Sequence, residues 1–223
     1  MSYNGLDILI QALSNDGGLV NHLIENTLFV HPDKVRRQAI RMLDDAQNGT
    51  LPVRFSTEEY VYCYADARRH KRLFSNKAEA VRQSESKAIY TTVRPDIRIM
   101  VDKDGNYWVR RAIRDYTGET VSAGAISTIK NYMISHIWGR TADPFFFTAL
   151  WNIALTPLHC SFILDKPDEH HPEIRNTKEL FKAICWELYA PNELLHAKLI
   201  EEPDAEMRRT ARRFIDNKQL KFI

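Results

Sequence analysis

The sequence lacks the long hydrophobic run that a membrane-spanning helix requires. Its most apolar stretch, Pro144 to Leu155, is shorter than the roughly 18–20 residues needed for a span and contains Asn152. The mean hydropathy is −0.40. The N-terminus has neither the basic start nor the cleavage site of a secretory signal. We therefore expect a soluble, cytoplasmic protein that does not associate with membranes.

Cysteine is scarce as well. The three cysteines, Cys63, Cys160 and Cys185, are far apart in the sequence and odd in number. They form no Cys-x-x-Cys pair, which argues against a zinc knuckle built from thiolates. Their use is typical of a protein from a reducing compartment.

A strong charge of one sign is also missing, because 31 basic and 29 acidic residues leave a net charge of only +2. This balance neither requires nor excludes a nucleic-acid partner, since local patches matter more than the sum. The basic residues do gather in three clusters, at 68–72, at 110–114 and at 208–213. Each cluster alone is compatible with a solvated face, but three in one small protein favour a polyanionic partner.

The 223 residues and 23 aromatic side chains are enough for one large domain or two small ones. Hydrophobic spacing, Gly and Pro positions and capping residues predict the elements. Helices are expected over 5–48 with breaks, and over 57–72, 76–87, 121–132, 175–189 and 204–217, with a β-hairpin turning at 102–106. We predict an α+β fold, with a helical N-terminal region over 1–87. The region 88–223 would hold the hairpin, a ββα unit and C-terminal helices.

The most specific stretch is 134–166, which predicts strand, loop, strand and helix. His136 ends the first strand, and Asn152 opens the second one 16 positions later. A general base needs an imidazole that is neutral at working pH and held in one orientation. A histidine at a strand end, with an asparagine bracing the loop beside it, satisfies that pattern. A structural histidine is the alternative interpretation.

This segment resembles the HNH, or His-Me finger, endonucleases. Ser135-His136-Ile137 is similar to the His-bearing strand of that family, and Asn152-Ile153 is similar to its second strand. The resemblance implies a ββα-metal fold, His136 as general base, Asn152 as the structural asparagine, and a divalent metal ion. The usual ligand positions correspond to Ser135 and Ser161. His159 or Asp165 could replace them if the helix register differs.

The expected function is therefore a metal-dependent endonuclease that hydrolyses DNA, with Mg²⁺ favoured over Mn²⁺ or Zn²⁺, in a restriction or phage-related role. DNA is the expected partner, and a homodimer is left open. The residues expected to hold its phosphates are Arg68, Arg69, Lys71, Arg110, Arg111 and Arg140. Two alternatives stay open: a non-catalytic nucleic-acid-binding module on the same scaffold, and a protein–protein adaptor that uses the aromatic-rich segment 145–151.

Overall fold

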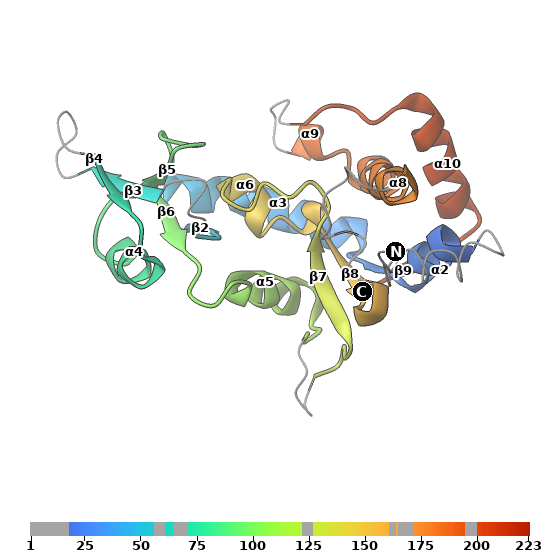
Figure 1. Ribbon diagram of the computed structural model, residues 1–223, viewed down its shortest axis with the longest axis horizontal. Coiled ribbons are helices and arrows are strands. Elements are labelled where there is room, and N and C mark those ends of the chain that lie inside the picture. The colour runs from blue at the N-terminus through green and yellow to red at the C-terminus, as the bar shows by residue number, and fades with distance from the viewer. Residues whose placement is uncertain are drawn as a thin grey trace, which may run out of the picture.

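The fold is α+β, with helices and small sheets interleaved along the chain (Figure 1). A computed structural model describes residues 18–55, 61–64, 71–121, 127–160, 164, 172–194 and 200–223, without the side chains of 19, 61–64, 71 and 72. Among these residues, no helix is long and apolar enough to cross a membrane.

The main sheet has four strands in the order β7-β8-β1-β9. Strands β7 (Tyr132–His136) and β8 (Ile153–Pro157) are antiparallel, which confirms the strand pairing expected from the sequence. Strand β1 (Leu28–Phe29) pairs antiparallel with β8 and parallel with β9 (Lys221–Phe222). All five residues of β8 are buried, as expected for an inner strand covered on both faces.

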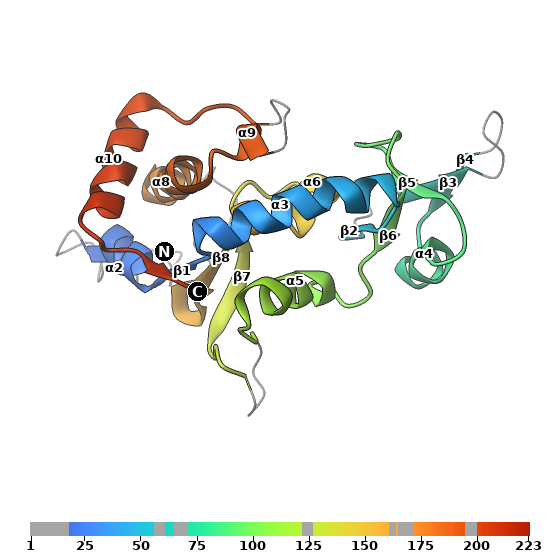
Figure 2. The same cartoon turned by 180° about the vertical axis from the view of Figure 1, so that it is seen from behind.

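Helices surround this sheet. The longest are α3 (Pro32–Gln47) and α8 (Pro172–Tyr189), and α2 (Gly18–Asn26), α9 (Pro191–Leu194) and α10 (Ala205–Asp216) complete this part. The core that they share with the sheet is rich in aromatic side chains, which include Phe29, Phe146, Trp151 and Phe181. Helix α3 crosses the middle of the molecule, with α8 and α10 near one end and β2 and β6 near the other (Figure 2).

A second, smaller core lies at that far end, away from α8 and α10 (Figure 1). Strands β2 (Leu51–Val53) and β6 (Ile99–Val101) pair in parallel. Strands β4 (Lys71–Phe74), β3 (Val61–Tyr64) and β5 (Ile89–Thr91) form a three-stranded sheet beside helix α4 (Lys77–Ser84). The β2–β6 and β3–β5 pairings join the predicted N-terminal region, 1–87, to the region that follows it.

The predicted helix over 57–72 is wrong, because β3 and β4 occupy its described parts. The acidic start at Ser56–Glu59 indicated a helix N-terminus, but Val-Tyr-Cys-Tyr is rich in residues that favour strands. The backbone of this strand, β3, pairs with β4 on one side and with β5 on the other. Long-range pairing therefore outweighs the local capping signal.

The predicted hairpin around 102–106 is also wrong, since α5 (Tyr107–Thr117) stands where its second strand was expected. Asn106, the residue before the helix, makes no capping hydrogen bond with its side chain; instead Asp102 Oδ1 accepts from the Trp108 backbone N–H in the first turn at 3.0 Å. Val109 and Ile113 are buried four positions apart, which is helical spacing. The hydrophobic residues at 107–112 fit a strand as well as a helix, and the hydrogen bond between Trp108 and Asp102 favours the helix.

The helix expected over 121–132 is contradicted at its described ends. Val121 forms an isolated bridge with Ile129, and Tyr132 already belongs to β7. The other helices predicted from caps and periodicity are confirmed, as α3, α4, α8 and α10. After β8 the chain enters a short 3-10 turn, η2 (Leu158–Cys160), where the helix of the ββα unit was expected to begin.

Candidate functional site

The hairpin of β7 and β8 presents His136 and Asn152 next to each other. His136 is the last residue of β7 and lies opposite Ile153 in the register. Asn152 ends the 3-10 turn η1 (Leu150–Asn152), and its carbonyl accepts a hydrogen bond from Ile137 N–H at 2.8 Å. The sequence spacing of these two residues therefore corresponds to a real structural neighbourhood.

Asn152 is fully buried and braces the loop between the two strands. Its Oδ1 accepts from the Trp138 backbone N–H at 2.8 Å. Its Nδ2 donates to the carbonyl of Phe146 at 2.9 Å and to that of Gly139 at 3.2 Å. One side chain thus satisfies three backbone groups of the loop, which fixes the loop's shape.

The His136 ring is held in one orientation. Its Nε2 lies 2.9 Å from the carbonyl oxygen of Phe147, and the ring stacks on the Phe147 ring at 5.7 Å between centroids and 8° between planes. Because a carbonyl can only accept, Nε2 must carry the proton, so the neutral ring has its lone pair on Nδ1. Burial lowers the pKa of His136 to about 4, and the Arg54 charge acts in the same direction. The imidazole is therefore neutral at physiological pH.

Arg54 connects this histidine to helix α5. Its guanidinium lies 5.9 Å from the Phe147 ring centroid. It also donates to the carbonyl of Gly105 at 3.2 Å and to Oδ1 of Asn106, the residue before α5, at 2.6 Å. The beginning of α5 and the end of β7 are thus joined through one fixed cation.

Two further arginines flank helix α6 (Pro144–Phe147). Arg94 lies over the Phe145 ring at 4.9 Å, and Arg140 lies over the Phe146 ring at 3.9 Å. The charges of both arginines lie near the buried carboxylate of Asp143. This residue caps α6 and forms an ion pair with Arg140 at 3.0 Å. Burial raises the pKa of Asp143, and the two arginines oppose that rise. Three arginines therefore lie beside the aromatic rings of this loop, and two of them, Arg94 and Arg140, pair with Asp96 and Asp143.

Helix α5 carries a second group of cations. Arg110, Arg111 and Arg114 line one shallow pocket together with Tyr107. The side chains of these arginines are 39%, 47% and 58% exposed. Asp104 and Asp115 pair with them, yet residues 103–117 hold four basic and only two acidic side chains. The face combines a positive excess with aromatic rings, because Arg111 also lies 5.0 Å from the Trp108 centroid.

The residues expected to bind a metal ion near His136 do not assemble there in the described part of the chain. Ser135 is buried, and its Oγ lies 2.9 Å from Oγ1 of Thr156. Because successive residues of a strand point to opposite faces, the Ser135 side chain faces away from that of His136. His159 follows the other end of β8, so the five residues of that strand and Leu158 separate it from Asn152. At about 3.3 Å per strand residue, His159 is too far to share an ion with His136. Ser161 and Asp165 lie outside the described residues.

The expected phosphate-binding residues separate into three groups. Arg110 and Arg111 lie together on α5, and Arg140 lies beside the loop of the hairpin. Arg68 and Arg69 fall outside the described residues, and of Lys71 only the backbone, in β4, is described. The structure adds Arg54 and Arg94, which no motif marked in the sequence.

Most of the chain matches a known protein family. Residues 30–222 match the profile of a family described as "Uncharacterised protein PM1201". The chain belongs to this family. No curated protein and no solved structure matches the chain. The family match contains His136, Asn152 and all the arginines named above.

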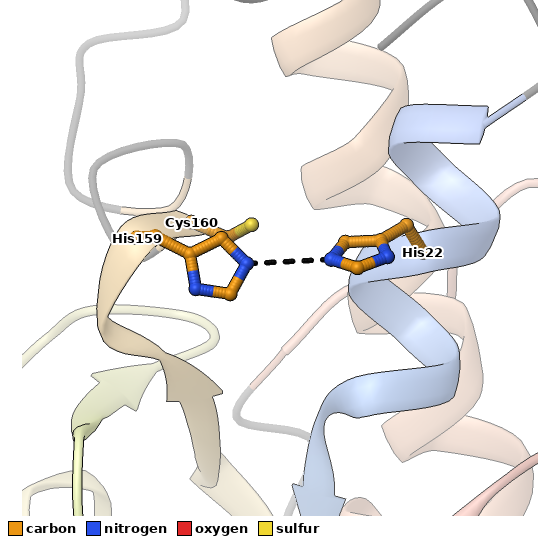
Figure 3. Close-up of side chains that lie close together, drawn as sticks. All are labelled: His22, His159 and Cys160. Atoms are coloured by element: carbon orange, nitrogen blue, oxygen red, sulfur yellow. Dashed lines mark hydrogen bonds between the residues drawn. The ribbon is translucent and has the colours of Figure 1, made fainter.

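A second side-chain group was not anticipated from the sequence. His22, His159 and Cys160 place their ligand atoms within 4.8 Å of one another (Figure 3). His159 was expected to face the hairpin, but it faces α2 instead, 137 positions away in the sequence. No spacing rule could have found a pair so widely separated.

Proposed function

We propose that the protein binds nucleic acid, with DNA as the favoured partner, through the cationic face of α5 and the loop between β7 and β8. The observation that carries this proposal is Arg54, which ties the α5 terminus at Asn106 to the stacked pair of His136 and Phe147. A phosphate backbone would run from the arginines of α5 to Arg140 beside the loop. Most of the affinity would then come from phosphate neutralisation.

The adaptor alternative loses its basis. Phe145, Phe146, Phe147, Leu150 and Trp151 are all buried, with exposures between 0% and 8%. They form the core rather than a surface for a partner. The aromatic-rich segment 145–151 therefore supports the hairpin from behind.

An endonuclease remains the second candidate, and one observation favours it. His136 is neutral, fixed in one tautomer and braced by a neighbouring loop that Asn152 holds. That is the condition for a proton acceptor at Nδ1. The resemblance to the HNH endonucleases supports it too. The described groups around His136 do not suit Mg²⁺, which prefers carboxylates and water.

The test of binding is a titration of duplex DNA over a series of salt concentrations. Each lost phosphate contact lowers the slope of log K against log salt by about 0.9 for B-form DNA. The double variant Arg110→Ala/Arg111→Ala should therefore reduce the slope by roughly 2. A matched control is Arg175→Ala/Arg209→Ala, which removes the same charge from the exposed surfaces of α8 and α10. No duplex binding at low salt, or equal losses in both variants, would refute the proposal.

Cleavage is measured in parallel on supercoiled plasmid with Mg²⁺, Mn²⁺ or Zn²⁺. For an endonuclease, His136→Ala should reduce the rate by about 10²–10⁴-fold, the usual contribution of a positioned proton acceptor, and should leave DNA affinity unchanged. DNA binding without cleavage in any of the three metals would assign the non-catalytic module instead.

We also propose a cytoplasmic location. Cys160 and Cys185, the two cysteines whose side chains are described, are both buried free thiols. A reducing compartment keeps such thiols in this form. Whether the protein acts as a homodimer is decided by light scattering with and without DNA.

A further inference from the structure

A cluster of two histidines and one cysteine lies on the sheet at the end of the hairpin away from His136. The Nε2 atoms of His22 and His159 point toward each other at 3.3 Å, and Cys160 lies beside them (Figure 3). We propose that these three residues bind a zinc-like divalent transition-metal ion. This site is independent of the proposed nucleic-acid surface.

The backbone that carries the three ligands is anchored on one sheet. Helix α2, which holds His22, leads directly into β1, and β1 pairs with β8 through Leu28 and Leu155. Strand β8 leads directly into η2, which holds the other two ligands, and Leu158 N–H donates to the Asn131 carbonyl at 2.8 Å. The ligands thus approach from two segments fixed to each other by strand pairing, so little order must be gained on binding.

The separation of the imidazoles suits a shared ion. With Zn–N bonds of about 2.05 Å, two nitrogens at corners of one tetrahedron lie about 3.3 Å apart. The two Nε2 atoms already have that separation. The sulfur, with a Zn–S bond of about 2.3 Å, would lie about 3.6 Å from each nitrogen. All three ligand atoms are within 4.8 Å now, and the ring centroids lie 5.6 Å apart, so the two rings face each other nearly head-on. A shift on the order of 1 Å and a tilt of each ring by roughly 35° toward a shared ion complete the geometry.

The ligand types select the class of ion. Thiolate and imidazole favour Zn²⁺ and similar transition metals, whereas Mg²⁺ and Ca²⁺ prefer oxygen ligands. Cys160 is buried and the two histidines are exposed, so the ion would sit at the surface. Three protein ligands supply three of four tetrahedral positions, as at catalytic zinc sites, where water or substrate takes the fourth.

Binding must release a proton from the sulfur. A cysteine binds such an ion as the thiolate, so its S–H bond must be broken. On binding, that bond breaks, the proton passes to solvent, and the electron pair forms the metal–sulfur bond. Affinity should therefore rise with pH, by up to tenfold per pH unit while one proton is exchanged.

The experiment uses the full chain, first stripped with a chelator and then titrated with Co²⁺ and Zn²⁺. Binding through Cys160 should produce a thiolate-to-cobalt charge-transfer band with one ion per chain, and Zn²⁺ should displace the cobalt. His22→Ala and His159→Ala remove exposed rings, so the fold should survive, and each should weaken affinity by at least tenfold. Cys160→Ser should abolish the band.

The matched control is His31→Asn, which removes an exposed imidazole elsewhere while keeping an acceptor for the Asp33 N–H at the start of α3. It should bind cobalt as the wild type does. The proposal fails if the wild type shows no thiolate band, or if His22→Ala and His159→Ala bind as tightly as the control. In that case the contact is a hydrogen bond between the two rings, with one Nε2–H donating to the other Nε2.

Discussion

Replacing Asn152 by alanine should strongly destabilise the protein. The substitution removes the partner of one buried carbonyl, that of Phe146, and of two partly buried groups, the Trp138 N–H and the Gly139 carbonyl. An unpaired buried polar group costs about 1–3 kcal/mol, and a lost ordinary hydrogen bond about 0.5–1.5 kcal/mol. The expected loss in the free energy of unfolding is therefore about 2–6 kcal/mol.

The assay is urea unfolding at pH 7.5 followed by intrinsic tryptophan fluorescence. A matched control is Asn76→Ala, which removes one exposed asparagine hydrogen bond at the start of α4. Loss of such a helix cap costs about 1 kcal/mol. If Asn152→Ala costs no more than the control, the brace is not an important part of the fold. The loop beside His136 must then be ordered by other contacts.

Two other perturbations test the buried and partly buried charges. The pKa of His136 is about 4 in the folded chain and near 6.5 in the unfolded chain. Between these two pH values the unfolded state binds more protons than the folded state does. The free energy of unfolding therefore falls as the pH is lowered from 6.5 to 4. At pH 5 this histidine should lower the free energy of unfolding by about 2 kcal/mol relative to pH 7.5, and His136→Gln should remove that difference. If the wild type and the variant lose stability in parallel as the pH falls, the pKa of His136 is not lowered. Glu187 on α8 accepts from Arg212 at 2.6 Å and from Arg208, both on α10. Burial raises its pKa, but the hydrogen bonds from the two arginines prevail and lower it, so Glu187→Gln should destabilise the α8–α10 pair by about 1–2 kcal/mol at pH 7. A lower melting temperature at low salt, with a smaller loss at high salt, is the expected result; an unchanged melting temperature would show that the pair contributes nothing.

Elements with strong local signals could be predicted from the sequence. Helix α3 starts with His31-Pro32-Asp33, and α10 starts with Asp204, whose Oδ1 accepts from the Glu206 N–H at 2.7 Å. Such caps act within a few residues and are visible in the sequence. The hairpin of β7 and β8 was also predictable, because its turn residues and its two strands are close in sequence. The strand β3 was not, because its partners β4 and β5 decide its conformation.

The same distinction applies to the sites. The neighbourhood of His136 and Asn152 follows from a 16-residue spacing within one hairpin. Arg54 reaches that histidine from the end of β2, and His22 reaches His159 from the helix before β1. Both contacts depend on how separate elements pack against each other. A single sequence has no local pattern that records such packing.

The pairing of β1 with β9 has a consequence for how the chain is made. Leu28 lies opposite Lys221, and Ile223 N–H donates to the Phe29 carbonyl at 2.9 Å. The early strand β1 therefore cannot gain its second neighbour until residues 221 and 222 have emerged from the ribosome. Until then β1 is itself an edge strand of the sheet, and an unpaired edge invites pairing with other chains. Chaperones that bind nascent chains would act during this interval, and stalled synthesis before residue 221 should yield an aggregation-prone intermediate.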